Sequence, residues 1–215
     1  KGLEFKEVDD FNASKTEVEA YKYKQFVSQY PKETSYFQPI LDVLDYQPGL
    51  LEYVPKIVIT EGKFDFFTLK YFKDIVLKKD TDEYHFYPGQ GASCLDLPIA
   101  LYEAWGRQYI VLLDADNEGK KQKKRYIENL SDDAHVFTLE DIDQSNKGFS
   151  TEKLFSDDEK LAIAKEFNPS LSVYEKSAFN TGLQVLLAEK KIPNYISEST
   201  KTKFEAIINF CKSKF

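Results

Sequence analysis

The sequence predicts an α/β fold in which helices cover a parallel β-sheet. Between residues 56 and 139, short apolar runs rich in β-branched and aromatic residues alternate with longer segments of helical spacing. Strands separated by helices of this length form right-handed βαβ units, so their sheet is parallel. The apolar runs show little alternation with polar residues, as expected for strands that are buried on both faces.

Four strands and three intervening helices are predicted in this segment. We expect the strands at residues 56–60, 84–87, 109–113 and 135–139. An amphipathic helix is expected through Phe66, Leu69, Phe72 and Val76. A second helix carries Leu97, Ala100, Leu101 and Trp105, and a third runs from about residue 118 to residue 130.

The sequence divides into a core with an extension on either side. We predict an N-terminal helical or irregular extension over residues 1–54, a catalytic core over residues 55–150 and a C-terminal helical extension over residues 151–215. Pro169 and Pro193 separate the helical pieces of the C-terminal extension, because proline interrupts a helix.

Composition limits the class of protein. A hydrophobic content of 42% is that of a folded globular chain, no apolar stretch is long enough to span a bilayer, and no signal peptide opens the sequence. We therefore expect a cytoplasmic protein without a membrane partner. The net charge of −7 argues against a simple basic nucleic-acid-binding module, but not against a nuclease whose acidic residues bind a cation. Because the 215 residues include no methionine and begin at Lys1, we expect a segment of a longer protein.

Acidic side chains follow two of the predicted strands at the point where each strand ends. Glu61 and Asp65 lie in the motif ITEGKFD, and Asp114 and Asp116 lie in LLDADNEG. The carboxyl edge of a parallel sheet is where open α/β folds bind ligands, and carboxylate oxygens suit Mg²⁺ or Mn²⁺. The sequence therefore predicts a divalent-metal site.

Each acidic motif also has a simpler explanation. If a helix begins near Lys63, Glu61 and Asp65 lie one helical turn apart and could reach the same point. The simpler explanation is that an acidic residue at the start of this helix merely complements the helix dipole. Asp114 and Asp116 could both point to one side of an extended segment, or could belong to an exposed turn. Gly62 would allow a tight turn after the first strand, and Gly119 a close approach after the third.

Taken together, the two motifs resemble the Toprim domain, which is shared by topoisomerases, bacterial primases and several nucleases. The resemblance covers about residues 56–140. It implies a Toprim or Rossmann-like sheet, a Glu61 that acts as acid/base or organises metal, and an Asp114 and Asp116 that hold Mg²⁺ or Mn²⁺. Glu61, Asp114, Asp116 and Lys176 are the predicted catalytic residues.

Within Toprim proteins, the second acid of the first motif is most similar to the C-terminal nuclease domain of overcoming-lysogenization-defect (OLD) family ATP-dependent endonucleases. That resemblance implies a second metal bound by Asp65, although this position departs from the glutamate of the family. It also implies a further acid and a lysine in the C-terminal extension, for which Glu152 and Lys176 are the best matches. Glu152 could instead simply start a helix.

The family resemblance also implies partners. It implies an ABC-type ATPase domain that precedes Lys1, a role in anti-phage defence, and a possible homodimer. The run of Lys120, Lys121, Lys123 and Lys124 beside the second acidic motif could contact DNA phosphates, although such a run is usually a solvated helix face.

The function predicted from the sequence is hydrolysis of DNA phosphodiester bonds by a metal-dependent endonuclease with one or two Mg²⁺ or Mn²⁺ ions. In this scheme Lys176 would offset charge on the pentacoordinate phosphorus. Two alternatives stay open. The acidic motifs are also similar to those of primases, which would make the chain a nucleotidyl transferase, and a degenerate Toprim domain could serve as a scaffold.

Overall fold

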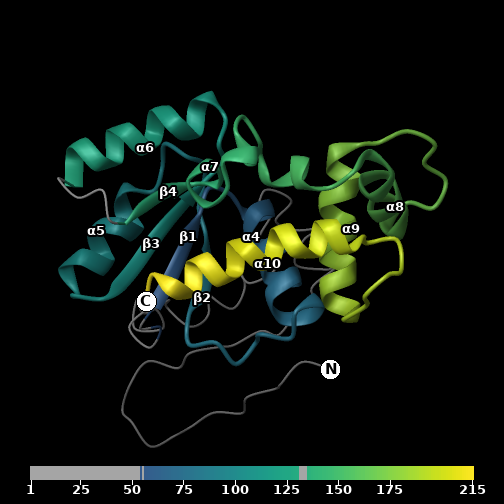
Figure 1. Ribbon diagram of the computed structural model, residues 1–215, viewed down its shortest axis with the longest axis horizontal. Coiled ribbons are helices and arrows are strands. Elements are labelled where there is room, and N and C mark those ends of the chain that lie inside the picture. Colours follow the sequence, from purple (N-terminus) through teal and green to yellow (C-terminus); the bar gives the residue numbers. More distant parts are fainter. Residues whose placement is uncertain (1–53, 55, 131–134) are drawn as a thin grey trace, which may run out of the picture. The chain divides into compact units, whose positions relative to one another are not determined.

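Figure 1 shows the computed structural model, in which residues 54, 56–130 and 135–215 are described. These residues belong to one compact unit, Val54–Phe215. The predicted N-terminal extension, residues 1–54, lies outside the described residues except for Val54. No helix in the described part of the chain is long and apolar enough to cross a membrane.

The described residues form a four-stranded parallel sheet, as predicted. The strand order is β2-β1-β3-β4, with β1 at Lys56–Thr60, β2 at His85–Pro88, β3 at Gln108–Leu113 and β4 at Val136–Thr138. Val58 in β1 lies opposite Phe86 on one side and Ile110 on the other. The α/β fold class is therefore confirmed.

Helices connect the strands and follow them. Their bounds are α4 Lys63–Tyr71, α5 Asp96–Ala104, α6 Asn117–Leu130, α7 Leu139–Ile142, α8 Asp157–Phe167, α9 Lys176–Glu189 and α10 Glu198–Ser213. Three shorter pieces are the π-helical continuation of α4, η1 Phe72–Val76, and the 3₁₀ turns η2 Gln144–Asn146 and η3 Thr151–Leu154.

The fourth strand is shorter than predicted, because a helix starts where the sequence pattern still suggested a strand. The side chain of Asp141 accepts hydrogen bonds from the Thr138 backbone N (2.6 Å) and hydroxyl (2.8 Å). This cap ends β4 at Thr138 and begins α7 at Leu139.

Alternate residues of the strands enter two separate cores, one on each face of the sheet. Val58, Ile110 and Leu112 pack with α4, η1 and the C-terminal helices. On the opposite face, Ile57 and Val111 pack with α5 and α6. Both faces of the central strands are buried, as the absence of polar alternation predicted.

The helix α5 buries a different face from the one by which the sequence identified it. Its buried residues are Ile99 and Tyr102, whereas Leu97 is 77% exposed. The predicted helix is confirmed. Because it is short and carries apolar residues on all sides, the spacing that identified it does not show which face is buried.

The predicted C-terminal extension is helical and completes the core instead of standing apart from it. Phe204 of α10 stacks on Phe72, with 3.8 Å between the ring centroids, and α10 runs across the sheet in Figure 1. The helices α8 and α9 touch at Gly182, where an added Cβ atom would lie 2.0 Å from the carbonyl oxygen of Ile163. Only glycine allows this approach.

The chain connections create a crevice between β1 and β3. The connection from β1 to β2 packs α4 on one face of the sheet, whereas the connection from β3 to β4 packs α6 on the other face. Neighbouring strands whose connections leave in opposite directions form a topological switch point, and ligands of open α/β sheets bind at the carboxyl ends of such strands. Glu61 follows β1 at this point, and Asp114 follows β3.

Candidate metal and catalytic site

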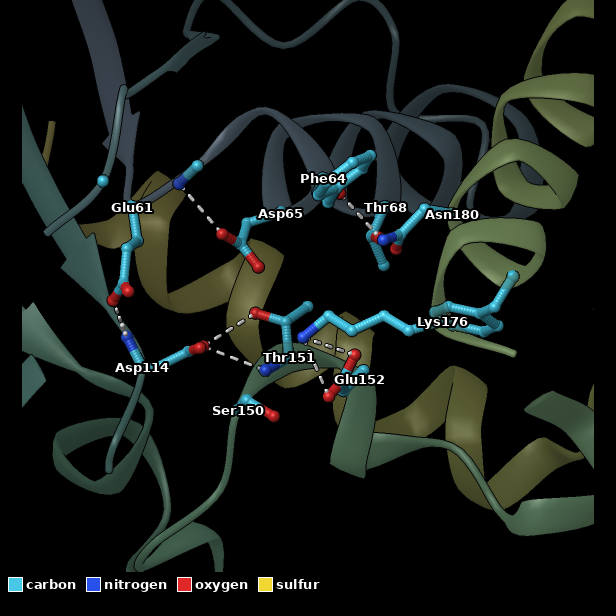
Figure 2. Close-up of a pocket in the computed structure, with 13 residues that line it drawn as sticks. Glu61, Phe64, Asp65, Thr68, Asp114, Ser150, Thr151, Glu152, Lys176 and Asn180 are labelled. Carbon is cyan, nitrogen blue, oxygen red and sulfur yellow. Dashed lines mark hydrogen bonds and ion pairs between the residues drawn. The ribbon is translucent and has the colours of Figure 1, made fainter. Parts of the chain in front are cut away.

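A pocket of about 190 Å³ opens at this switch point (Figure 2). It brings together Glu61, Asp65, Asp114, Glu152 and Lys176, which are five of the six predicted catalytic and metal-binding residues. Its other lining residues are Gly62, Phe64, Thr68, Gly91, Ser150, Thr151, Phe179 and Asn180.

Glu61 bridges the ends of the two central strands. Its carboxylate accepts a hydrogen bond from the backbone N of Asp114 (3.3 Å), and its own carbonyl accepts one from the backbone N of Gly91 (2.9 Å). Burial raises the pKa of Glu61, the hydrogen bond from Asp114 opposes this, and repulsion by Asp65 adds to the rise. A cation near this carboxylate would relieve both unfavourable contributions.

Asp65 lies in the first turn of α4, which begins at Lys63 as predicted. Its carboxylate caps the helix by accepting a hydrogen bond from the backbone N of Gly62 (2.9 Å), so the capping role and the pocket role coexist. Burial raises the pKa of Asp65. The predicted turn at Gly62 does not require glycine, because its backbone is extended (φ −141°).

Asp114 accepts hydrogen bonds from Thr151, which lies 37 residues further along the chain. One carboxylate oxygen accepts hydrogen bonds from both the backbone N (2.9 Å) and the hydroxyl (3.2 Å) of Thr151. Burial raises the pKa of Asp114 to about 8, with further contributions from the charges of Asp65 and Glu61, while the bonds from Thr151 act in the opposite direction. The ionised carboxylate of Asp114 therefore lies among negative charges, and a nearby positive charge would stabilise it.

Asp116 does not line the pocket. Its carboxylate instead accepts a hydrogen bond from the backbone N of Gly119 (2.8 Å) at the start of α6. An added Cβ atom on Gly119 would lie 2.1 Å from the carbonyl oxygen of Asp114, so the predicted close approach of this glycine is present. Asp116 still contributes to the raised pKa of Glu61, and the cap bond engages only one of its two carboxylate oxygens.

Glu152 and Lys176 form an ion pair on the far side of Asp114. The Lys176 Nζ atom lies 3.1 Å and 3.2 Å from the two carboxylate oxygens of Glu152, and the Tyr174 hydroxyl donates to Glu152 at 3.4 Å. Glu152 lies in the first turn of η3, so it belongs to a helical turn and also lines the pocket. Lys176 is the cationic side chain among the lining residues.

The four predicted DNA-binding lysines separate into two pairs. Lys120 and Lys123 bind the acidic residues of α7, Lys120 with Glu140 and Lys123 with Asp141 at 2.8 Å. The side chains of Lys121 and Lys124 are 74% and 79% exposed and lie 4.0 Å and 3.8 Å from acids of their own helix.

Sequence reasoning missed the polar and aromatic residues of the pocket. Thr151 is isolated in the sequence from the acid that it holds, and no motif marks it. Phe64 and Thr68 lie one turn apart on the same face of α4. Asn180 lies one turn from Lys176 on the same face of α9. The spacing of four between Lys176 and Asn180 was the available signal.

The chemistry of the pocket fits a hard divalent cation. Its four carboxylates are opposed by one lysine, and three of the carboxylates have raised pKa values. Among the described residues, no three His, Cys, Asp or Glu side chains are already arranged as a metal-binding group. One oxygen each of Asp65, Glu61 and Asp114 accepts a hydrogen bond from the backbone N of Gly62, Asp114 and Thr151, respectively, which leaves the second oxygen of each carboxylate for a cation.

Solved structures with a similar fold are C-terminal regions of OLD proteins. The one from Burkholderia pseudomallei is 14% identical, with a TM-score of 0.47 and coverage of 74% of this chain and 99% of that chain. The one from Xanthomonas campestris pv. campestris is 10% identical, with a TM-score of 0.49 and coverage of 75% and 95%. No family model and no curated protein matches the sequence. Identities this low assign no residue roles.

Proposed function

We propose that this chain is the metal-dependent nuclease domain of a DNA endonuclease. One observation carries the proposal: three carboxylates with raised pKa values, Glu61, Asp65 and Asp114, converge at the topological switch point beside the Glu152–Lys176 ion pair. Catalytic sites are places where burial and like charges are arranged to shift pKa values in this way. The Toprim resemblance of the two acidic motifs gives this geometry its chemical interpretation.

Each residue has a distinct role in the proposal. Mg²⁺ or Mn²⁺ would activate water and offset phosphate charge. Glu61, Asp65, Asp114 and Glu152 would hold one or two ions. Asp116 would join them through the carboxylate oxygen that its helix cap does not use, and Thr151 would orient Asp114. The Nζ atom of Lys176 would contact a non-bridging oxygen of the scissile phosphate and offset the charge that develops there.

DNA would approach the site along α6. Lys121 and Lys124 are the best placed of the four lysines for phosphate contacts, because their side chains are largely exposed. Lys120 and Lys123 are engaged with α7 and would contribute less. A surface of this kind supplies affinity that is independent of DNA sequence.

The motif resemblance supports a wider setting for the domain. We propose that it functions with an ABC-type ATPase domain in a longer cytoplasmic protein of anti-phage defence, which could act as a homodimer. The described residues themselves carry the proposed cleavage chemistry, not the ATPase function.

Cleavage of supercoiled plasmid DNA with Mg²⁺ or Mn²⁺ tests the nuclease proposal. We expect nicked or linear product from the wild type and a loss of at least about 10²-fold in Asp114→Asn, because removing one ligand charge disables metal-dependent catalysis. Asp80→Asn, at an exposed position outside the pocket, serves as the matched control. Cleavage by Asp114→Asn at the wild-type rate would contradict the proposal.

Isothermal titration of the protein with Mn²⁺ separates the nuclease from a scaffold. We expect binding by the wild type that is weakened in Asp114→Asn and unchanged in Asp80→Asn. An absence of Mg²⁺ and Mn²⁺ binding would instead favour a degenerate Toprim scaffold. Incorporation of labelled ribonucleotides on a single-stranded template would favour a primase-like transferase.

A further inference from the structure

The side of the pocket opposite the strand ends is built by two facing helices. α4 contributes Phe64 and Thr68, and α9 contributes Lys176 and Asn180, each pair four residues apart and therefore on one helix face. Figure 2 shows Phe64, Thr68 and Asn180 on the side away from Glu61 and Asp114. Of these four residues, only Lys176 has a role in the metal chemistry above.

Asn180 carries a carboxamide that has no hydrogen-bond partner among the described residues. The residue as a whole is only 5% exposed and lines the pocket, and the bond from Gln184 goes to its backbone carbonyl. Its amide atoms are not among the fully buried polar atoms that are left unpaired, so they are open to the pocket. The carboxamide can donate and accept at the same time, so its chemistry matches a ligand edge that carries both an acceptor and a donor.

Phe64 supplies an aromatic surface in the same half of the pocket. It is 37% exposed and lies in the first turn of α4, on the lining of the pocket. The Nζ atom of Lys63 lies 5.1 Å from the ring centroid, so a positive charge accompanies the exposed ring. Thr68 donates its hydroxyl to the Phe64 carbonyl (2.9 Å), which leaves the hydroxyl oxygen free to accept.

A ring, an unpaired amide and a lysine beside a phosphate-cleaving centre match the parts of a nucleotide. We propose that the α4–α9 half of the pocket binds a nucleobase that is unstacked from the DNA strand, with its plane on Phe64 and its polar edge on Asn180. This inference rests on the proposed function, because Lys176 would hold the neighbouring phosphate at the metal centre. A base stacked within an intact duplex cannot reach such a site, so the substrate class is single-stranded DNA or duplex DNA opened at the cleavage point.

Cleavage of matched substrates tests the role of Phe64. We expect the wild type to cut a single-stranded oligonucleotide at least about tenfold faster than the same sequence in a duplex, and Phe64→Ala to lose most of this preference through a raised KM. Phe64→Trp should retain the preference, since stacking needs only an aromatic plane. Phe167→Ala, at another exposed phenylalanine that does not line the pocket, is the control. Equal rates on both substrates, or an unaltered preference in Phe64→Ala, would overturn the inference.

Base discrimination tests the role of Asn180 without relying on fold stability. With the base next to the scissile phosphate varied among the four nucleotides, the wild type should cut one of them several-fold faster, and Asn180→Leu, which keeps a similar side-chain volume, should cut all four alike. A uniform drop in rate with discrimination intact would show a structural role for Asn180 and overturn the base contact.

A binding measurement distinguishes failure of the inference from failure of the proposed nuclease function. We expect the fluorescence of a single-stranded oligonucleotide containing 2-aminopurine to change on addition of metal-free wild-type protein and to change much less with Phe64→Ala. A signal without any DNA cleavage would leave the base site standing and remove the nuclease proposal. An equal signal from both proteins would overturn the base site even if cleavage is observed.

Discussion

Two buried carboxylate regions of this protein illustrate opposite uses of the same chemical group. Glu159, at the start of α8, is 3% exposed and accepts hydrogen bonds from the backbone N of Ser156 (2.8 Å), the backbone N of Ser197 (2.7 Å) and the Thr200 hydroxyl (2.8 Å). Burial alone would raise the pKa of Glu159, but these hydrogen bonds outweigh it and lower the pKa.

The pocket carboxylates have too few donors for their number. Asp114 receives hydrogen bonds from Thr151 on one oxygen only, and it faces two further acids, Glu61 and Asp65. Its pKa therefore rises where that of Glu159 falls. Burial acts to raise both pKa values, and the hydrogen-bond donors and neighbouring charges decide whether the pKa falls, as at Glu159, or rises, as at Asp114.

The largest effect that follows from this comparison is expected at Glu159. In Glu159→Gln the new amide group would face a backbone N–H that has lost its acceptor, so we expect a loss of about 3 kcal/mol in the free energy of unfolding at pH 7. Urea denaturation measures this loss. The exposed Glu198→Gln should change stability by less than about 0.5 kcal/mol, and a similarly small change in Glu159→Gln would remove the contrast between the two regions.

A smaller effect of opposite sign is expected at Asp114. A carboxyl group with a raised pKa binds its proton more tightly in the folded state, so the stability of the metal-free protein should fall as pH rises from about 4 to about 8. Asp114→Asn removes the charge and should be about 2 kcal/mol more stable than the wild type at pH 8.5 without metal. Mn²⁺ should narrow this difference by binding the wild type. Thermal denaturation across pH would contradict the comparison if both proteins showed the same pH dependence.

The smallest expected effect on stability comes from removing one of the two hydrogen-bond donors to Asp114. Thr151→Val removes the hydroxyl but keeps the backbone N–H, so the pKa of Asp114 should rise further. We expect the pH at which the metal-free protein loses stability to move upward by about half a unit. Thr202→Val, whose exposed hydroxyl bonds to the Glu198 carbonyl, is the control, and a shift of equal size in the control would show that the change is unrelated to Asp114.

The sequence predicted the strand ends that carry Glu61 and Asp114 better than it predicted the other residues that line the pocket. The strands β1 and β3 were located to within one residue, because short β-branched runs between helical segments are typical of buried strands. The predicted strand ends also gave the positions of Glu61 and Asp114 at the edge of the sheet. Glu152 and Lys176 reached the pocket as the family resemblance implied.

The remaining differences have local and tertiary origins. Asp116, predicted as a metal ligand from the D-x-D motif and the Toprim resemblance, lies outside the pocket lining, and one of its carboxylate oxygens accepts a local hydrogen bond from Gly119. Asn180 faces the pocket because α9 packs against α4, and Thr151 because its backbone N and hydroxyl bond to Asp114. No spacing within their own segments ties these two residues to Asp114.

The close approach at Gly182 has a consequence for heredity. Here the spacing between α8 and α9 depends on a missing methyl group, and α9 carries both Lys176 and Asn180. Any codon for another amino acid at position 182 would displace a helix that bears two pocket residues while leaving every residue of the pocket unchanged. Loss-of-function alleles could therefore arise at a site with no chemistry of its own.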